Sequence, residues 1–147
     1  MDSSALSRLL GEAGAALGDS LRFDPAGESY ADVTSERLLA VVEALMGVDG
    51  FHHLSAITGQ DRGDALELLY HFWCGGGLTL RVRCPREGAT LPSLMALLPG
   101  ADWYEREIHE MLGVDFGGRP PLEPLLLPDD WEEAPPLLAA DERGGER

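Results

Sequence analysis

The chain of 147 residues contains no lysine, and its 11 basic residues, all arginine, stand against 26 aspartates and glutamates. The formal net charge is −15 at pH 7. Because such an acidic surface repels phosphate backbones and anionic lipid headgroups, the composition argues against nucleic-acid binding. A partner protein with a basic surface suits this charge better.

Cysteine and long apolar runs are also scarce. Two cysteines, Cys74 and Cys84, are too few for a disulfide framework. No apolar run approaches the roughly 20 residues that a membrane-spanning helix needs. Residues 1–4 do not begin the basic-then-apolar pattern of a signal peptide. We therefore expect a cytoplasmic protein whose membrane association, if any, is made through a partner.

Known catalytic signatures are missing as well. The sequence has no glycine-rich phosphate loop and no nucleophile elbow. His109 and Glu110 begin a zinc-protease pattern, but Gly113 stands where its second histidine would be.

A metal site built from the remaining histidines and the cysteines is weakly supported. His71 and Cys74, three residues apart near a strand end, would point to opposite faces of a continuing strand. Cys84 falls on an apolar face, where cysteine behaves as a small hydrophobic residue. Zinc needs about four ligands at close spacing, and these residues are not spaced in that way, so we expect no metal. The candidates are His52, His53, His71, Cys74 and Cys84.

Periodicity predicts the first two thirds of the fold. Apolar residues at helical spacing predict helices over residues 4–17 and 35–46. A short extended piece is predicted over residues 21–23, before a turn signal. Strands are predicted over residues 51–58, 65–73 and 78–84, joined by breaks short enough for hairpins. The strict alternation of residues 78–84 predicts one apolar and one wet face, so the sheet should be antiparallel.

The last third mixes short helices with irregular chain. Helices are predicted over residues 93–98 and 103–112, with Asp102 as N-cap, Glu105 in the capping-box position and Gly113 as the stop. Glycine and proline then forbid regular structure over residues 117–128, which we call the strap. We predict one domain over residues 1–128 and an acidic, flexible tail over 129–147.

These elements predict an α+β fold. It has an antiparallel sheet of about three to four strands, packed with two to three helices, and the C-terminal irregular strap.

The helix at 103–112 has two interpretations. Its charges could form an ordinary solvated face, with Arg106 paired to Glu110 and Glu105 to His109. However, aromatic and apolar residues share the same short helix, and the strap follows at once. That mixture is typical of a buried or interface helix whose charges are paired by neighbours, and we predict that Glu107 belongs to a buried pair.

Residues 103–118 carry a resemblance to a known family. They read Trp-Tyr-Glu-Arg-Glu-Ile-His-Glu-Met-Leu-Gly-Val-Asp-Phe-Gly-Gly. This resembles the signature of the 30 kDa subunit of respiratory complex I, a module that also occurs in membrane-bound hydrogenases. The pattern has Glu-Arg-Glu, two free positions, an acid, two apolar residues, then glycine and an aromatic residue. Residues 91–94 and 99–103 and the order of elements add to the resemblance, which spans roughly residues 34–127.

The resemblance implies a non-catalytic structural subunit of a complex-I-like oxidoreductase, either an NADH–quinone oxidoreductase or a membrane-bound hydrogenase. Such a protein binds no cofactor and supports electron transfer and proton translocation. It docks on the hydrogenase-large-like subunit of the peripheral arm, beside an Fe–S subunit. Its partners carry Fe–S clusters, and flavin or nickel–iron. The location implied is cytoplasmic, peripheral on the inner face of the cell membrane through the complex.

The residues that the resemblance assigns to the motif and the subunit interface are Trp103, Glu105, Arg106, Glu107, Glu110, Gly113, Phe116, Arg119, Leu122 and Leu125. Three features depart from the pattern. The sequence has Ala134-Pro135-Pro136-Leu137 in place of the basic Arg-Lys-Asp-Phe-like ending that is common in complex I members. The family usually has histidine or lysine where Arg119 stands, and a basic residue near Glu123. These departures favour a short, divergent member of a hydrogenase-type or otherwise reduced assembly.

Two other functions stay open at this point. The acidic composition also fits a stand-alone protein-interaction module, such as an adaptor or inhibitor. A small hydrolase or metal enzyme would use His52, His53 and His71.

Overall fold

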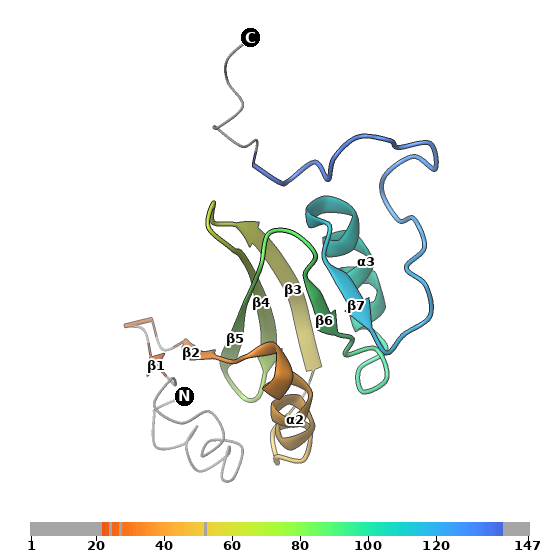
Figure 1. Ribbon diagram of the computed structural model, residues 1–147. Helices are drawn as coiled ribbons and strands as arrows, with labels where there is room; N and C mark the ends of the chain where they lie inside the picture. Colours follow the sequence, from red (N-terminus) through yellow and green to blue (C-terminus); the bar gives the residue numbers. More distant parts are fainter. Residues whose placement is uncertain (1–21, 24, 27, 52, 140–147) are drawn as a thin grey trace.

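The computed structural model describes residues 22–139, apart from residues 24, 27 and 52. The predicted helix at 4–17 lies outside the described residues. The α+β fold is confirmed (Figure 1), and its elements are β1 (Arg22–Phe23), β2 (Ser29–Asp32), α2 (Ser35–Met46), β3 (His53–Asp61), β4 (Leu66–Trp73), β5 (Gly77–Cys84), β6 (Thr90–Pro92), α3 (Ala101–Leu112) and β7 (Asp115–Gly117).

The three strands predicted from the sequence form one side of the main sheet, with β3 at its edge. β3, β4 and β5 are successive antiparallel neighbours, as predicted. Gly63 (φ +90°) and Gly75 (φ +73°) lie in the two turns between them, where only glycine takes a positive φ without strain. The predicted helix over 35–46 is α2, and the extended piece at 21–23 appears as β1.

The sheet as a whole is mixed rather than antiparallel. Its order is β1-β2-β5-β4-β3, and β2 pairs with β5 in parallel, with Ser29 opposite Leu78. A second, two-stranded sheet joins β6 to β7, also in parallel. Sequence reasoning missed β2, β6 and β7 because each has only three or four residues and pairs with a distant segment.

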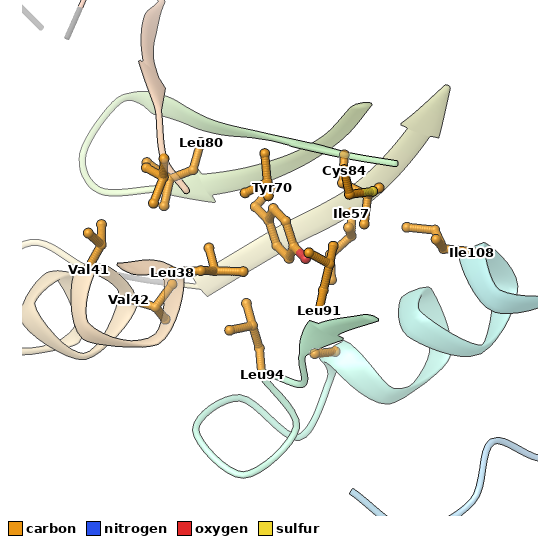
Figure 2. Packing of buried hydrophobic residues seen from close by; sticks show 14 of the residues in the cluster. Leu38, Val41, Val42, Ile57, Tyr70, Leu80, Cys84, Leu91, Leu94 and Ile108 are labelled. Carbon is orange, nitrogen blue, oxygen red and sulfur yellow. The ribbon is translucent and has the colours of Figure 1, made fainter. Parts of the chain in front are cut away.

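The core lies between one sheet face and a layer made of α2, β6 and α3. In Figure 2, Tyr70 and Leu80 of the sheet face Leu38 and Val41 of α2 and Leu91 of β6. All five side chains are at most 1% exposed. The opposite sheet face is polar, as the alternation predicted, and carries the ion pairs Arg81–Asp32 and Arg83–Glu67.

The chain around α3 differs from the prediction. Residues 95–97 form a turn, in which the Leu98 amide donates to the Leu94 carbonyl at 2.8 Å, instead of a helix over 93–98. Pro99 cannot donate a backbone hydrogen bond and disfavours helix at the residue before it, so the turn does not propagate. The helix α3 begins at Ala101, with Gly100 as N-cap and no side-chain cap. The predicted cap by Asp102 is therefore wrong, while Gly113 (φ +74°) ends the helix as predicted.

Close packing of α3 on the sheet depends on Gly59 of β3. A Cβ atom at this position would overlap the Leu112 side chain and touch Ile108. Glycine at position 59 therefore brings α3 against the edge strand and sets the height of the helix above the sheet.

Candidate functional site

The buried face of α3 contains a carboxylate. Ala101, Glu105, Ile108 and Leu112 follow the spacing i, i+4, i+7, i+11, and all are buried. Glu105 is 0% exposed. An acid inside an apolar helical stripe must find hydrogen-bond partners, because burying an unpaired charge is costly.

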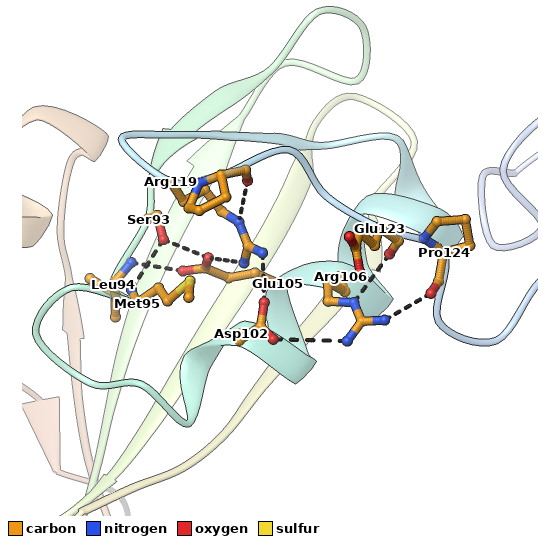
Figure 3. Close-up of polar contacts among 10 residues, drawn as sticks. Ser93, Leu94, Met95, Asp102, Glu105, Arg106, Arg119, Glu123 and Pro124 are labelled. Carbon is orange, nitrogen blue, oxygen red and sulfur yellow. Dashed lines mark hydrogen bonds and ion pairs between the residues drawn. The ribbon is translucent and has the colours of Figure 1, made fainter.

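Glu105 finds these partners on three sides (Figure 3). Its carboxylate accepts from the Ser93 hydroxyl at 2.7 Å and from the Leu94 amide at 2.7 Å. Arg119 donates to it from Nη1 at 3.1 Å. The residue predicted as part of a capping box therefore joins α3 to the preceding turn and to the strap.

Arg119 is the strap's contribution to this cluster. Its side chain is only 4% exposed, and its Nη2 donates to Asp102 Oδ1 at 2.5 Å. Burial alone would lower the pKa of this guanidinium, but hydrogen bonds to Asp102 and Glu105 outweigh that effect and raise it. Arg119 is therefore charged at any ordinary pH and neutralises part of the two carboxylates.

Arg106 attaches the strap further along the helix. Its guanidinium donates to the carbonyl oxygens of Glu123 at 3.1 Å and Pro124 at 2.8 Å. It also lies 5.5 Å from the ring centre of Trp103, whose side chain is 63% exposed, and 3.8 Å from Asp102. Its ion-pair partner is thus Asp102, one turn before it, and not Glu110 as in the solvated-face interpretation.

Glu110 binds the next strap residues through their backbone. Its carboxylate accepts from the amides of Leu125 (2.5 Å), Leu126 (2.8 Å) and Leu127 (3.3 Å). Partial burial raises the pKa of Glu110, but these three amides and the Arg106 charge outweigh it, so the pKa lies below its ordinary value. Arg106 and Glu110 together give the irregular strap the backbone partners that a helix or sheet would have provided.

The chain after the strap returns to the domain. The Leu137 amide donates to the Met111 carbonyl at 2.9 Å, and the Ala139 amide donates to Asp61 at 2.8 Å. Arg86 donates to Asp61 and to the Ala139 carbonyl, and holds the pKa of Asp61 at about 2. The flexible tail expected over residues 129–147 stays a prediction. Backbone groups of residues 137–139 hydrogen bond to the domain, and residues 140–147 lie outside the described residues.

The other predicted site residues are either packed against the domain or exposed. Phe116 is 6% exposed in β7, and Leu122 packs against the core. Leu125 is partly buried, and Pro135 packs against Gly113. Glu107 is exposed, so it forms no buried pair within the described chain, and a pair buried against a partner stays a prediction. The buried acid of the motif is Glu105.

Two further participants were missed as site residues. Ser93 and Asp102 complete the cluster around Arg119 and Glu105. The available signal was Glu105 itself, since an acid on the stripe of Ala101, Ile108 and Leu112 requires buried donors. Which donors these would be depends on the tertiary fold.

The candidate metal residues are not gathered. His71 hydrogen bonds to the hydroxyls of Thr58 (2.9 Å) and Thr79 (3.0 Å) on the polar sheet face, and Cys74 and Cys84 are separately buried free thiols. Within the described part of the chain, no three His, Cys, Asp or Glu residues are grouped to hold a metal ion. In the same part, no helix has the length and apolar character to cross a bilayer.

Known proteins have related sequences. The family model "Respiratory-chain NADH dehydrogenase, 30 Kd subunit" matches residues 31–144. The chain is 35% identical over 127 residues to the J subunit of NAD(P)H-quinone oxidoreductase from Prochlorococcus marinus (strain NATL1A), covering 78% of this chain and 73% of that one. It is 37% identical over 103 residues to the C subunit of F(420)H(2) dehydrogenase from Methanosarcina mazei, covering 67% and 65%.

Solved structures share the fold. A trypsin-resistant fragment of Nqo5 superposes with a TM-score of 0.68 at 26% identity, covering 80% of this chain and 98% of the fragment. A chain of the membrane-bound sulfane sulfur reductase, an archaeal respiratory membrane complex, superposes with a TM-score of 0.69 at 20% identity, covering 86% and 76%. The resemblance seen in residues 103–118 is confirmed: the chain belongs to the family of the respiratory-chain NADH dehydrogenase 30 Kd subunit.

Proposed function

We propose that this chain is a non-catalytic structural subunit of a complex-I-like oxidoreductase, of the NADH–quinone oxidoreductase or membrane-bound hydrogenase type. Its relatives are named as subunits of such enzymes, including NAD(P)H-quinone oxidoreductase and F(420)H(2) dehydrogenase. In this role the chain supports electron transfer and proton translocation by holding the complex together.

The observation that carries the non-catalytic role is that three charged residues of the motif, Glu105, Arg106 and Glu110, already have partners. Glu105 is bonded to Ser93, Leu94 and Arg119, and Glu110 to three backbone amides. Arg106 donates to two carbonyls. A catalytic acid or base must reach a substrate proton, whereas these groups are occupied in shaping the corner between α3 and the strap.

The partner that we propose is the hydrogenase-large-like subunit of the peripheral arm, beside a neighbouring Fe–S subunit. The corner of α3 and the strap would meet it, and the exposed side chains Trp103 and Leu126, 63% and 61% exposed, support this choice of surface. Cofactors would belong to the partners, as Fe–S clusters and flavin or nickel–iron. The chain would then lie on the inner face of the membrane through the complex.

Co-expression with the neighbouring genes tests the proposal. A tag on this chain should recover a hydrogenase-large-like subunit in stoichiometric amount. The iron, and the flavin or nickel, should be bound to the partners that are recovered with it. Recovery of a monomer, with no such partner in the eluate, would favour the stand-alone acidic interaction module instead.

A further inference from the structure

A groove lies at the carboxyl end of α3, between the strap and the returning residues 129–139. The strap side is fixed by the Glu110 carboxylate, and the returning side by the Met111 carbonyl and by contact of Pro135 with Gly113. The groove has a volume of about 310 Å³. Because contacts within the chain hold both walls, the groove exists before any partner binds.

The groove has apolar walls and an acidic rim. Leu122, Leu127 and Trp131 line it, together with the carboxylates of Asp129 and Glu133. Trp131 is 39% exposed, so its ring is open to contact. Residues 120–139 contain five carboxylates and no basic side chain. Apolar walls under a rim with an excess of carboxylates call for an occupant with an apolar stem and a cationic end.

The larger hollow beside the start of α2 lacks this character. It has a volume of about 700 Å³, and its lining carries Arg81 and Arg83 as well as Asp32 and Glu36. Charges of both signs face it, so it selects no cation. Among the described residues, no arginine lines the strap groove. Its one histidine, His109, lies 3.2 Å from Asp115, and the nearby Arg106 donates to the carbonyls of Glu123 and Pro124, so neither group pairs with the rim carboxylates Asp129 and Glu133.

We propose that the strap groove receives an arginine side chain from the partner subunit. Its aliphatic stem would pack on the leucines, its guanidinium would stack on Trp131, and its five N–H groups would pair with Asp129 and Glu133. A second copy of this chain suits the groove less well, because two molecules of net charge −15 repel each other. The inference rests on the proposed function, since it names the chemistry by which the partner recognises this chain.

The test measures binding of the full chain to the co-expressed, purified large subunit at several salt concentrations. The variant Asp129→Asn/Glu133→Gln removes two rim charges and preserves size. Its matched control, Glu43→Gln/Asp49→Asn, removes two charges from exposed positions on α2 and the turn after it. We expect the rim variant to bind about tenfold more weakly and with a shallower salt dependence, and the control to match the unaltered chain.

A second variant addresses the aromatic wall. Trp131→Leu keeps an apolar side chain but removes the ring face. We expect about a fivefold loss of affinity, with the dependence of affinity on salt concentration unchanged. Thermal unfolding midpoints equal to that of the unaltered chain would show that the variants are folded.

Each remaining outcome decides against the idea. Equal affinity of rim variant and control would overturn the arginine site and leave the proposed function standing. Failure of the unaltered chain to bind the large subunit would overturn both. Sedimentation showing a dimer of this chain that the rim variant abolishes would assign the groove to a second copy.

Discussion

Two arginine–carboxylate clusters in this molecule share their chemistry and differ in their surroundings. Arg119 meets Asp102 and Glu105 beneath the strap, where its side chain is 4% exposed. Arg81 meets Asp32 on the polar sheet face, where the side chains are 41% and 44% exposed. Water can replace either partner of the exposed pair, whereas nothing replaces Arg119 beside a buried Glu105. The difference between them is the cost of breaking the pair rather than its strength.

The largest effect should come from Arg119→Met. It leaves Glu105 charged and buried with no cation, so we expect a loss of about 3–5 kcal/mol in the free energy of unfolding. Urea unfolding followed by circular dichroism measures this. Arg119→Lys is the matched variant, and it should recover part of the loss because it restores the charge without the fork of donors. A loss below about 1 kcal/mol would mean that the cluster is as solvated as the exposed pair.

A smaller effect is expected from Glu110→Gln. The amide side chain offers one acceptor oxygen to three strap amides, so we expect a loss of about 1–2 kcal/mol and faster hydrogen exchange at Leu125, Leu126 and Leu127. Glu107→Gln removes the same charge from an exposed site three residues away and should change neither quantity. Equal exchange rates in the two variants would contradict the anchoring role of Glu110.

Because Glu110 anchors the strap as a carboxylate, the stability of the strap should depend on pH. The pKa of Glu110 is lower in the folded chain than its ordinary value. Its stabilisation is therefore fully present above the pKa of the unfolded chain and is lost as the pH falls through the folded pKa. The protection factors of the Leu125–Leu127 amides, which correct for the intrinsic slowing of exchange in acid, should fall as the pH falls in the unaltered chain. This fall should be absent from Glu110→Gln.

Breaking the exposed pair should matter less. Arg81→Gln leaves Asp32 facing water, and we expect the free energy of unfolding to fall by at most about 1 kcal/mol. The hydrogen bond from Arg81 is the main cause that lowers the pKa of Asp32. An NMR titration should therefore show the Asp32 pKa rising toward its ordinary value. A loss as large as that of Arg119→Met would remove the distinction between the two clusters.

The smallest effect is predicted for a buried polar group without a partner. The Tyr70 hydroxyl has no hydrogen-bond partner among the described residues, and its side chain is 0% exposed. Burial first, and the Glu105 charge second, raise its pKa, so it stays neutral. Tyr70→Phe should change the free energy of unfolding by no more than about 0.5 kcal/mol. A loss above about 1 kcal/mol would reveal a partner for the hydroxyl, such as a buried water.

Local pattern was enough to predict the elements with strong periodicity. α2 and the strands β3, β4 and β5 follow from local patterns of apolar residues and their glycine boundaries, which act over a few residues. β2 could not be predicted this way, because its partner β5 lies about fifty residues further along the chain and four residues carry little pattern. The parallel pairing of β6 and β7 could not be predicted for the same reason.

In the candidate site, too, local features could be predicted and contacts between distant segments could not. The motif located α3, its glycine stop and the family. It did not separate Glu105 from Glu107, because both are acids of one motif and only the apolar stripe of the helix distinguishes them. The bonds from Arg106 and Glu110 to the strap backbone could not be predicted, since irregular chain has no period that would place its amides and carbonyls.

Glu105 is enclosed by groups that precede and follow it in the sequence, and this fixes an order during synthesis. Ser93, Leu94 and all of α3 leave the ribosome before Arg119 does. Until that residue emerges, docking α3 would bury an unneutralised carboxylate, so the helix stays loosely held. We therefore expect the nascent chain to keep the apolar face of its sheet partly uncovered until the strap arrives. A ribosome-bound chaperone should matter most while residues 113–119 are being made.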